Sequence, residues 1–341
     1  MVKRKRKYSI FDKLLYFINS IVAAALLFSY FLAFVSPKTV PVFSVASLAV
    51  PFLIIINICF CVYWLFKLKK HIILSGVILL LGWFFFPPFL KFSKKNTPRN
   101  DDVKVMSYNV RMFNLYKWIK SDSIEDNIIS LIKEKSPDIL AIQEYHHSKK
   151  RDMGFPYSYY VPKSKKNNFG LAIFSKYKII NKGSLDFKHS ANNAIFIDIV
   201  KEKDTVRIYN LHLQSLKLNP KKENFGEKDS EKLIARLKNG FQKQASQVET
   251  FLAHEKKWKS RKIICGDFNN TAFSWVYRQI SKNKKDAFKV AGSGFGRSFN
   301  YFFPMRIDFI LTDTKTTINS FKTYNLKYSD HFPILSRINF E

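Results

Sequence analysis

The sequence predicts an α/β sandwich that follows three membrane-spanning helices. Two features of its 341 residues lead to this prediction. The first hundred residues are mostly apolar and aromatic, and they contain three nearly uncharged stretches of about 20 residues each. From residue 103 onward, short apolar runs alternate with amphipathic segments, and predicted strands outnumber predicted helices. Because the strands combine hairpin-like neighbours with helical crossovers, we expect two sheets inside and helices outside.

The three apolar stretches cover residues 14–35, 42–66 and 72–90. An α-helix of this length crosses the hydrocarbon core of a bilayer and satisfies its own backbone hydrogen bonds there. A cleavable signal peptide fits poorly, because the first stretch is too long and no small-residue cleavage site follows it. Buried helices of a soluble core are the remaining alternative. Pro87 and Pro88 should end or kink the third helix near the membrane surface.

Basic residues predict the orientation of these helices. The sequence MVKRKRK precedes the first stretch and KLKKH joins the second to the third, whereas the turn between the first and second holds one lysine. Because cytoplasmic loops are enriched in Lys and Arg, both basic segments should face the cytoplasm. The chain after residue 90 is then expected on the outer side of the membrane, although the basic KFSKK after the third stretch counts against this orientation.

The chain is therefore expected to consist of a membrane anchor over residues 1–92, a polar linker over 93–102 and a folded domain over 103–341. About 240 residues suffice for one domain with a full core. The predicted strands cover residues 103–110, 139–144, 159–163, 169–177, 194–200, 205–213, 262–269, 306–312 and 332–340, and the predicted helices cover 123–138 and about 229–254.

Charge and cysteine content narrow the function only slightly. The chain has 57 Lys and Arg against 26 Asp and Glu, a formal net charge of +31. This excess favours anionic partners such as phospholipid headgroups, nucleic acid or phosphorylated metabolites, but lysines that serve only solubility explain it equally well. The three cysteines form no disulfide framework and no zinc-binding spacing.

Several apolar strands end in polar side chains that the fold itself does not need. Burying such a group is costly unless it is paired or bound to a metal. A single case is ordinary for a turn, but six segments of this kind predict a shared site at one edge of the sheets. The residues are Asn109 in VMSYNV, Glu144 in ILAIQEYH, His212 in YNLHL, Asp267 and Asn269 in IICGDFN, Asp308 in RIDFIL, and Asp330 with His331 in YSDHFPI.

The acidic members of this set fit a divalent metal. Glu144, together with Asp330 or Asp267, offers the hard oxygen ligands that Mg²⁺ prefers. A covalent route is not indicated, because the sequence contains no G-x-S-x-G motif, no P-loop and no cysteine placed as a nucleophile.

The amides and histidines fit phosphoester chemistry. Asn109, Asn269 and His212 can donate hydrogen bonds to phosphate oxygens. His331 fits either a general base for water or a donor to the charge that develops on the phosphate, and Asp308 would orient its imidazole.

The ordered motifs SYNV, QE, HL, GDFN, IDFIL and SDHFPI closely resemble the endonuclease/exonuclease/phosphatase superfamily, which includes pancreatic-type deoxyribonucleases, apurinic endonucleases, neutral sphingomyelinases and inositol-phosphate phosphatases. The likeness runs from residue 103 to the C-terminus. The motif GDFN followed by SDH is specific, whereas either motif alone is weak. The resemblance implies a four-layer α/β/β/α sandwich and hydrolysis of phosphoesters by water, with Mg²⁺, or alternatively Mn²⁺, as the cofactor.

The resemblance also implies roles for individual residues. Glu144 is similar to the family's principal metal ligand, with Asn109 beside it and Asp330 as a carboxylate on the metal side. Asp267 resembles the aspartate that aligns or activates the attacking water. Asn269 would hold a phosphate oxygen.

The histidines resemble family positions as well. His331 is similar to the histidine that contacts the scissile phosphate, and Asp308 to its orienting partner. His212 matches a histidine of the deoxyribonuclease and sphingomyelinase branches, where apurinic endonucleases tend to have tyrosine. The glycine-rich segment 292–300 is either a flexible loop or a phosphate contact through Arg297 or Asn300.

The expected function is that of a membrane-tethered, metal-dependent phosphodiesterase, nuclease or phosphatase on the periplasmic face of a bacterial inner membrane. Its substrate would be nucleic acid or a phospholipid or sphingolipid headgroup. The alternative is a catalytically inactive relative that binds polyanions or a membrane partner.

Overall fold

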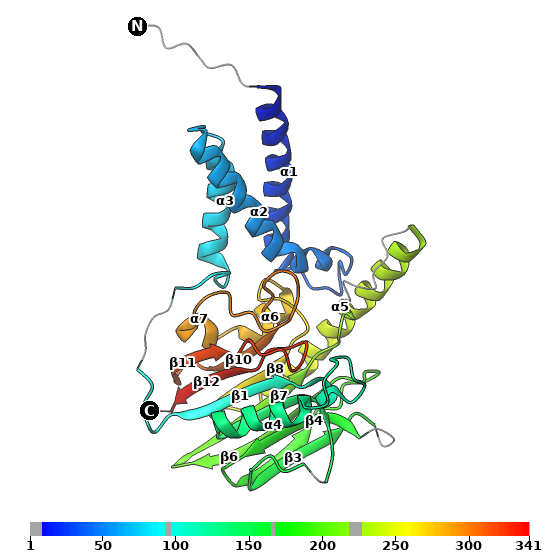
Figure 1. Cartoon of the computed structure of the whole chain (residues 1–341), viewed down its shortest axis with the longest axis vertical. Coiled ribbons are helices and arrows are strands. Elements are labelled where there is room, and N and C mark those ends of the chain that lie inside the picture. The colour runs from blue at the N-terminus through cyan, green and yellow to red at the C-terminus, as the bar shows by residue number, and fades with distance from the viewer. Residues whose placement is uncertain (1–8, 93–96, 150, 165–167, 218–226, 341) are drawn as a thin grey trace.

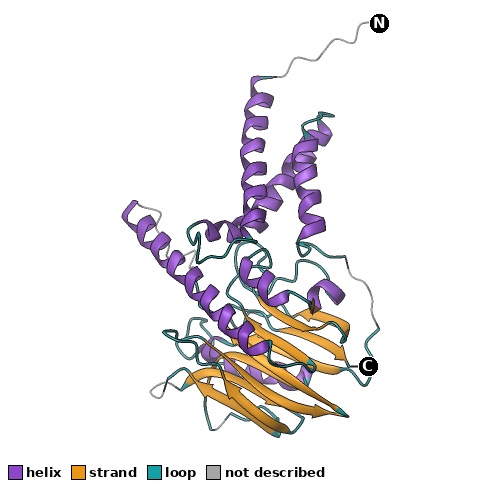
Figure 2. Cartoon of the chain, turned by 180° about the vertical axis from the view of Figure 1, so that it is seen from behind, coloured by secondary structure: helices purple, strands orange, loops and turns teal. Residues whose placement is uncertain are grey.

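The computed structural model describes residues 9–92, 97–149, 151–164, 168–217 and 227–340 (Figure 1). Three helices project from one end of a domain that is built from two six-stranded sheets. Seen from behind, the sheets lie between layers of helix (Figure 2).

The first sheet has the strand order β11-β12-β1-β2-β4-β3. Its central strands β1 and β2 are parallel and are connected through helix α4 (Ile124–Lys135), while the other neighbours are antiparallel. The strands are β1 Val103–Asn109, β2 Ile139–His146, β3 Tyr157–Pro162, β4 Phe169–Ser175, β11 Thr317–Thr323 and β12 Ile334–Asn339.

The second sheet repeats this plan with the order β5-β6-β7-β8-β10-β9. Strands β7 and β8 are its parallel pair, connected through the long helix α5 (Glu227–Glu255). The strands are β5 Ile179–Ser184, β6 Asn193–Lys201, β7 Asp204–His212, β8 Lys262–Asp267, β9 Lys284–Asp286 and β10 Asp308–Asp313.

The layers follow from the pattern of apolar side chains, as β8 illustrates. Ile263 and Cys265 lie in the core between the two sheets, whereas Ile264 packs on the other face with residues of α5 and α6 (Trp275–Ser281). Both faces of β8 are therefore buried, which explains why its sequence is continuously apolar. Helix α4 covers the first sheet in the same way. The predicted four-layer α/β/β/α sandwich is confirmed.

The topology brings particular strand ends together. Parallel strands end at the same edge of a sheet, so β1 and β2 finish together, as do β7 and β8. Strand β10 runs antiparallel to β8 and begins at Asp308, opposite Asp267. Strand β12 begins shortly after His331 and runs antiparallel to β1. All six polar strand ends therefore fall at one end of the sandwich.

The N-terminal helices differ from the prediction in one respect. Helices α1 (Ile10–Leu32) and α2 (Ala46–Phe66), the latter preceded by the short helix η1 (Phe43–Val45), are long and apolar enough to cross a membrane. The third, α3 (Ile72–Phe85), has only 14 residues and does not meet this criterion. The predicted third span over 72–90 is therefore wrong in length.

The short third helix has a local cause. Phe86 adopts an extended backbone with φ −123° and ψ 163°, and Pro87 and Pro88 follow it. Proline cannot continue a helical hydrogen-bond ladder and disfavours the helical conformation of the preceding residue. Fourteen residues rise about 21 Å, which is less than the roughly 30 Å of a bilayer core.

Two predicted boundaries also shift. The helix predicted over 123–138 ends at Lys135, because Ser136 is left-handed with φ 44° and Pro137 follows. In the described part of the expected linker, residues 97–102, the buried Asp102 accepts a hydrogen bond of 2.7 Å from Asn319 of β11. This part of the linker is thus fixed to the first sheet.

Candidate active site

The strand ends place a chain of acidic and imidazole groups in contact. His212 Nε2 lies 3.9 Å from Glu144 Oε1 and 3.7 Å from Asp267 Oδ2. On the far side, His331 Nε2 lies 3.6 Å from the same Asp267 oxygen, and His331 Nδ1 lies 2.9 Å from Asp308 Oδ2. Side chains from both sheets therefore meet in one cluster.

Glu144 reaches this cluster through an irregularity in β2. The pairing of β2 with β4 shifts register between Ile142 and Tyr145, and Glu144 has φ 52°. A bulge of this kind re-aims a side chain, and a positive φ is uncommon for a residue other than glycine. Such conformations cost about 1–3 kcal/mol and persist where the surroundings enforce them. The local strain directs a carboxylate into the site.

The end of β8 is shaped by its glycine. Gly266 has φ 144°, and a Cβ atom there would lie 2.0 Å from the carbonyl oxygen of Leu211 on β7. Only glycine permits this close approach of the two parallel strands. Beyond it, Asp267 faces the site, while Phe268 is fully buried and its ring centroid lies 4.7 Å from that of Phe309.

Asp267 is held by two amides. Its Oδ1 accepts a 2.7 Å hydrogen bond from the backbone N–H of Asn269, and its Oδ2 accepts one of 3.1 Å from Asn109 Nδ2. The Asn269 side chain donates to the Leu213 carbonyl oxygen at 2.9 Å, with φ 49° at Asn269 itself. In this arrangement, both asparagines fix the position of the carboxylate.

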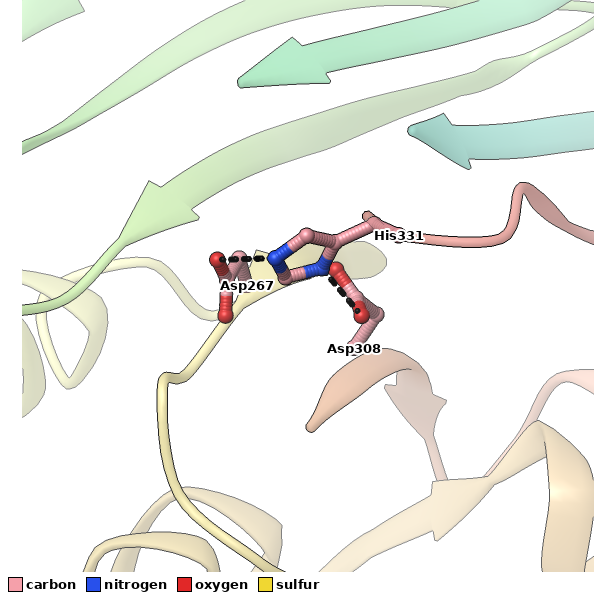
Figure 3. A group of neighbouring side chains, drawn as sticks. All are labelled: Asp267, Asp308 and His331. Carbon is pink, nitrogen blue, oxygen red and sulfur yellow. Dashed lines mark hydrogen bonds and ion pairs between the residues drawn. The ribbon is translucent and has the colours of Figure 1, made fainter. Parts of the chain in front are cut away.

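His331 lies between two aspartates, as Figure 3 shows. Burial alone would lower the pKa of His331, but the carboxylates of Asp308 and Asp267 outweigh it and raise this pKa to about 10. The three side chains offer ligand atoms within 4.8 Å of one another. An imidazolium has no lone pair to give a metal, so we interpret the group as a charged histidine oriented by two carboxylates.

His212 has the opposite protonation behaviour. Burial, followed by the charges of His331 and Lys163, lowers the pKa of His212 to about 3. Its imidazole is therefore neutral at physiological pH, with one ring nitrogen as donor and the other as acceptor.

Burial disfavours the charged form of two carboxylates in the site. Burial raises the pKa of Asp267 to about 7, with Asp308 adding to the effect and His331 opposing it. Burial and then the neighbouring Asp330 raise the pKa of Glu144. A divalent cation would relieve both effects, and these oxygens are the hard ligands that Mg²⁺ or Mn²⁺ prefers. The residues present thus fit a divalent metal.

Two arginines near the site have different surroundings. Arg111 lines the pocket, where its guanidinium lies 3.3 Å from Asp330 Oδ2 and 4.4 Å from the centroid of the Trp118 ring. Arg297 instead donates to Asn300 Oδ1 and to nearby carbonyl oxygens, so it braces its own loop.

Sequence patterns did not indicate several residues that line the pocket. They are Leu48, Ser215, Leu216, Lys217, Phe299, Tyr301, Met305 and Ile307. Among them, only Lys217 could have been suspected from the sequence, because it follows His212 by a few residues.

Two stacked mixed sheets, with acid, amide and histidine side chains gathered at their common end, define a phosphoester hydrolase of the α/β/β/α class. The chain belongs to the endonuclease/exonuclease/phosphatase family, whose model matches residues 106–331. Residues 12–89 match a second family, described as a domain of unknown function. No curated protein matches the chain.

Solved structures similar to the chain include the human Nocturnin catalytic domain with bound sulfate, which is 18% identical with a TM-score of 0.53 over 75% of this chain and 100% of that one. An endonuclease/exonuclease/phosphatase protein from Bacteroides vulgatus is 20% identical with a TM-score of 0.52 over 70% and 99%. The Bacteroides thetaiotaomicron mannosyl-6-phosphatase is 18% identical with a TM-score of 0.50 over 70% and 100%. At these identities the likeness concerns the fold.

Proposed function

We propose that the protein is a membrane-tethered, divalent-metal-dependent hydrolase in which water attacks the phosphorus of a phosphoester in line. The observation that carries this proposal is the contact chain from Glu144 through His212 and Asp267 to His331. Family membership adds hydrolysis of phosphoester bonds as the reaction class. The similar mannosyl-6-phosphatase is an example of that chemistry on this fold.

Glu144 would hold the metal, together with Asn109 and Asp330. When bound, Mg²⁺ or Mn²⁺ would polarise the phosphoryl oxygens and neutralise the charge that develops on them. Burial and then the charge of Asp330 raise the pKa of Glu144, and a bound cation would offset both by favouring the charged carboxylate.

The other side chains would act on the water and the phosphate. Asp267 would orient the water and accept its proton while the new phosphorus–oxygen bond forms, and the bond to the leaving alcohol breaks as that oxygen takes a proton from solvent. His331, held by Asp308, would donate to a phosphate oxygen that gains negative charge. Neutral His212 would donate to a second phosphate oxygen. Asn269 contacts the same oxygens in this proposal while its backbone N–H steadies Asp267.

Exposed apolar side chains support the tether. Phe11, Phe17 and Phe31 of α1 each expose more than 60% of their surface, and α3 exposes Phe84 and Phe85 to a similar degree. Apolar surface on this scale is rare on a soluble protein and is expected where helices face lipid. We place the domain on the outer face of a bacterial inner membrane. Nucleic acid and phospholipid headgroups both carry the required phosphoester.

The proposal is tested with the full chain in detergent, a soluble chromogenic phosphodiester and Mg²⁺. We expect turnover that EDTA abolishes and that added Mg²⁺ or Mn²⁺ restores. Asp267→Asn and His331→Ala should each lower the rate by about 10²–10⁴-fold. Asp204→Asn is the matched control, because it changes a carboxylate at the opposite end of the same sheet.

Unchanged turnover in EDTA, or in both active-site variants, would refute the proposal. Metal binding by calorimetry without turnover on any phosphoester would instead favour an inactive, polyanion-binding relative.

A further inference from the structure

One wall of the catalytic pocket comes from a membrane helix. The cavity that holds Glu144, Asp267 and His331 has a volume of about 340 Å³, and Leu48 from the first turn of α2 lines it. A soluble substrate does not require this arrangement. We propose, on the basis of the hydrolase function above, that the substrate is a membrane lipid whose phosphoester headgroup enters the pocket directly from the bilayer surface.

The first turn of α2 is fixed against the catalytic loop itself. Thr271 Oγ1 donates a 2.9 Å hydrogen bond to the carbonyl oxygen of Ser47, and Ser47 Oγ lies 3.5 Å from Asn270 Oδ1. Asn270 and Thr271 follow Asp267 by only three and four residues. All three polar residues of this contact are buried. The segment that carries the proposed base thus also docks the membrane helix.

The other helix ends reinforce this placement. Phe86, just beyond α3, packs on Phe273 with ring centroids 6.2 Å apart, and the Arg278 guanidinium lies 3.7 Å from the Phe34 ring centroid. Lys91 exchanges two backbone hydrogen bonds of 2.8 and 2.9 Å with Gly294. The domain is therefore seated on the helix bundle at several points, with the pocket on the same side.

The loop between Phe299 and Met305 is rich in aromatic residues and forms another wall of the pocket. Phe299, Tyr301 and Met305 line the cavity. In the same loop, the ring centroid of Phe303 lies 6.3 Å from that of Phe52 in the second turn of α2. Phe302 at the tip is 75% exposed. A solvent-exposed phenylalanine beside a membrane helix is suited to insertion into the lipid bilayer.

The positions of exposed aromatic side chains also support a lipid substrate. Exposed aromatic side chains gather at the helix ends nearest the domain, which is the position of the interfacial belt in membrane proteins. They are Phe31, Phe34, Phe43, Trp83, Phe84 and Phe85. Leu48 stands in the turn of α2 at this same end, so the pocket mouth lies at headgroup depth.

The pocket has a second compartment that faces away from the helices. A neighbouring cavity of about 390 Å³ shares Glu144 and includes Lys163, Asn192, Asn193 and His212. Its lining includes the end of β3 and the start of β4. Strand β3 lies in the half of the domain farther from the N-terminal helices (Figure 1). A lipid whose phosphate sits at Glu144 would direct its polar headgroup into this compartment and its apolar part toward Leu48 and the bilayer.

The test uses the full chain reconstituted with Mg²⁺ in vesicles of phosphatidylcholine, phosphatidylglycerol, phosphatidic acid and sphingomyelin. Phosphorus NMR follows the lipid products. The soluble phosphodiester and single- and double-stranded DNA oligonucleotides are assayed in parallel. We expect hydrolysis of at least one lipid, at a rate well above that of either oligonucleotide.

Phe302→Ser isolates the role of the membrane. Its side chain does not line the pocket, so turnover of the soluble phosphodiester should be unchanged, while lipid hydrolysis should fall about tenfold because an apolar contact with the bilayer is lost. Tyr157→Ser is the matched control, since Tyr157 is an exposed aromatic residue on β3, away from the helices. It should leave both activities intact.

Cleavage of the soluble phosphodiester with no lipid hydrolysis would overturn the lipid assignment and leave the proposed hydrolase function standing. Preferred cleavage of an oligonucleotide would also overturn it, in favour of a nuclease. If the protein with Mg²⁺ hydrolysed none of the lipids, the soluble phosphodiester or the oligonucleotides, both proposals would be refuted. Equal effects of Phe302→Ser and Tyr157→Ser on lipid hydrolysis would show that Phe302 does not contribute to the hydrolysis of lipid in the bilayer.

Discussion

His331 is contacted by two carboxylates that approach different ring nitrogens. Asp308 accepts a hydrogen bond from Nδ1 at 2.9 Å, whereas Asp267 lies 3.6 Å from Nε2 on the side of the pocket. Asp308 does not line the cavity and would act only through the histidine. It is therefore a positioning residue, and its contribution can be separated from that of Asp267.

Asp308→Asn should lower turnover by about 10²–10⁴-fold, because the imidazole loses the partner that fixes its orientation and charge. The pKa of His331 should also fall, since Asp308 is the leading influence that raises it. The imidazolium is then lost at lower pH, so the alkaline limb of the pH–rate profile should move to lower pH. A purely structural role would reduce activity without moving this limb. Asp313→Asn, at the other end of β10, is the control.

Among the structural elements, the three N-terminal helices are joined by a buried polar network. Asn19 of α1 donates to Ser75 Oγ of α3 at 2.6 Å and accepts from Trp64 Nε1 of α2 at 2.8 Å. Ser75 in turn donates to Asn57 Oδ1 at 2.8 Å. In the proposed membrane setting lipid offers no hydrogen-bond partners, so these contacts would favour one arrangement of the helices.

Asn19→Ala removes two interhelical hydrogen bonds and should lower the free energy of unfolding of the helix bundle by about 1–2 kcal/mol. Thermal unfolding of the full chain in detergent measures the change. Ser20→Ala is the matched control, because the Ser20 hydroxyl donates only to the Tyr16 carbonyl oxygen of its own helix. Equal stability of the two variants would show that the network does not hold the bundle together.

Strands that are buried on both faces were predictable from sequence, whereas three of the four edge strands were not. The apolar runs of β2 and β8 and the amphipathic pattern of α5 reveal their secondary structure directly. Strand β11 reads TINSFKT and its pairing shifts register between Ile318 and Ser320, so its alternation is broken. Strand β9 has three residues and no periodicity to detect. The sequence therefore identified the central strands of each sheet and the edge strand β3, but it missed the edge strands β5, β9 and β11.

The residues of the site also divide into those that the sequence indicates and those that it does not. Asp267 and Asn269 were predictable, because they are polar residues at the end of an apolar strand, on either side of the buried Phe268. The residues around them were not, because Leu48 and Tyr301 reach the pocket through tertiary contacts between distant segments. No local pattern encodes the docking of the N-terminal helix α2 on the loop that follows Asp267.

At the scale of the whole molecule, the helices and the sandwich have a defined polarity. Helix α1 descends toward the domain, α2 returns, and α3 descends again, so the loop between α2 and α3 lies at the end opposite the sandwich (Figure 1). That loop contains Lys67, Lys69 and Lys70, and the basic sequence MVKRKRK precedes α1 in the chain. This distribution supports the proposed orientation, with the loop in the cytoplasm and the sandwich outside.

A labelling experiment tests this orientation. In a chain with Cys59 and Cys61 replaced by alanine, a cysteine at Lys203→Cys, in the turn between β6 and β7, should react with a membrane-impermeant maleimide added to intact spheroplasts. A cysteine at Lys70→Cys should react only after the membrane is permeabilised. Both positions are exposed, so accessibility within the fold does not distinguish them. The reverse pattern would place the catalytic domain in the cytoplasm, and the lipid would then have to come from the inner leaflet.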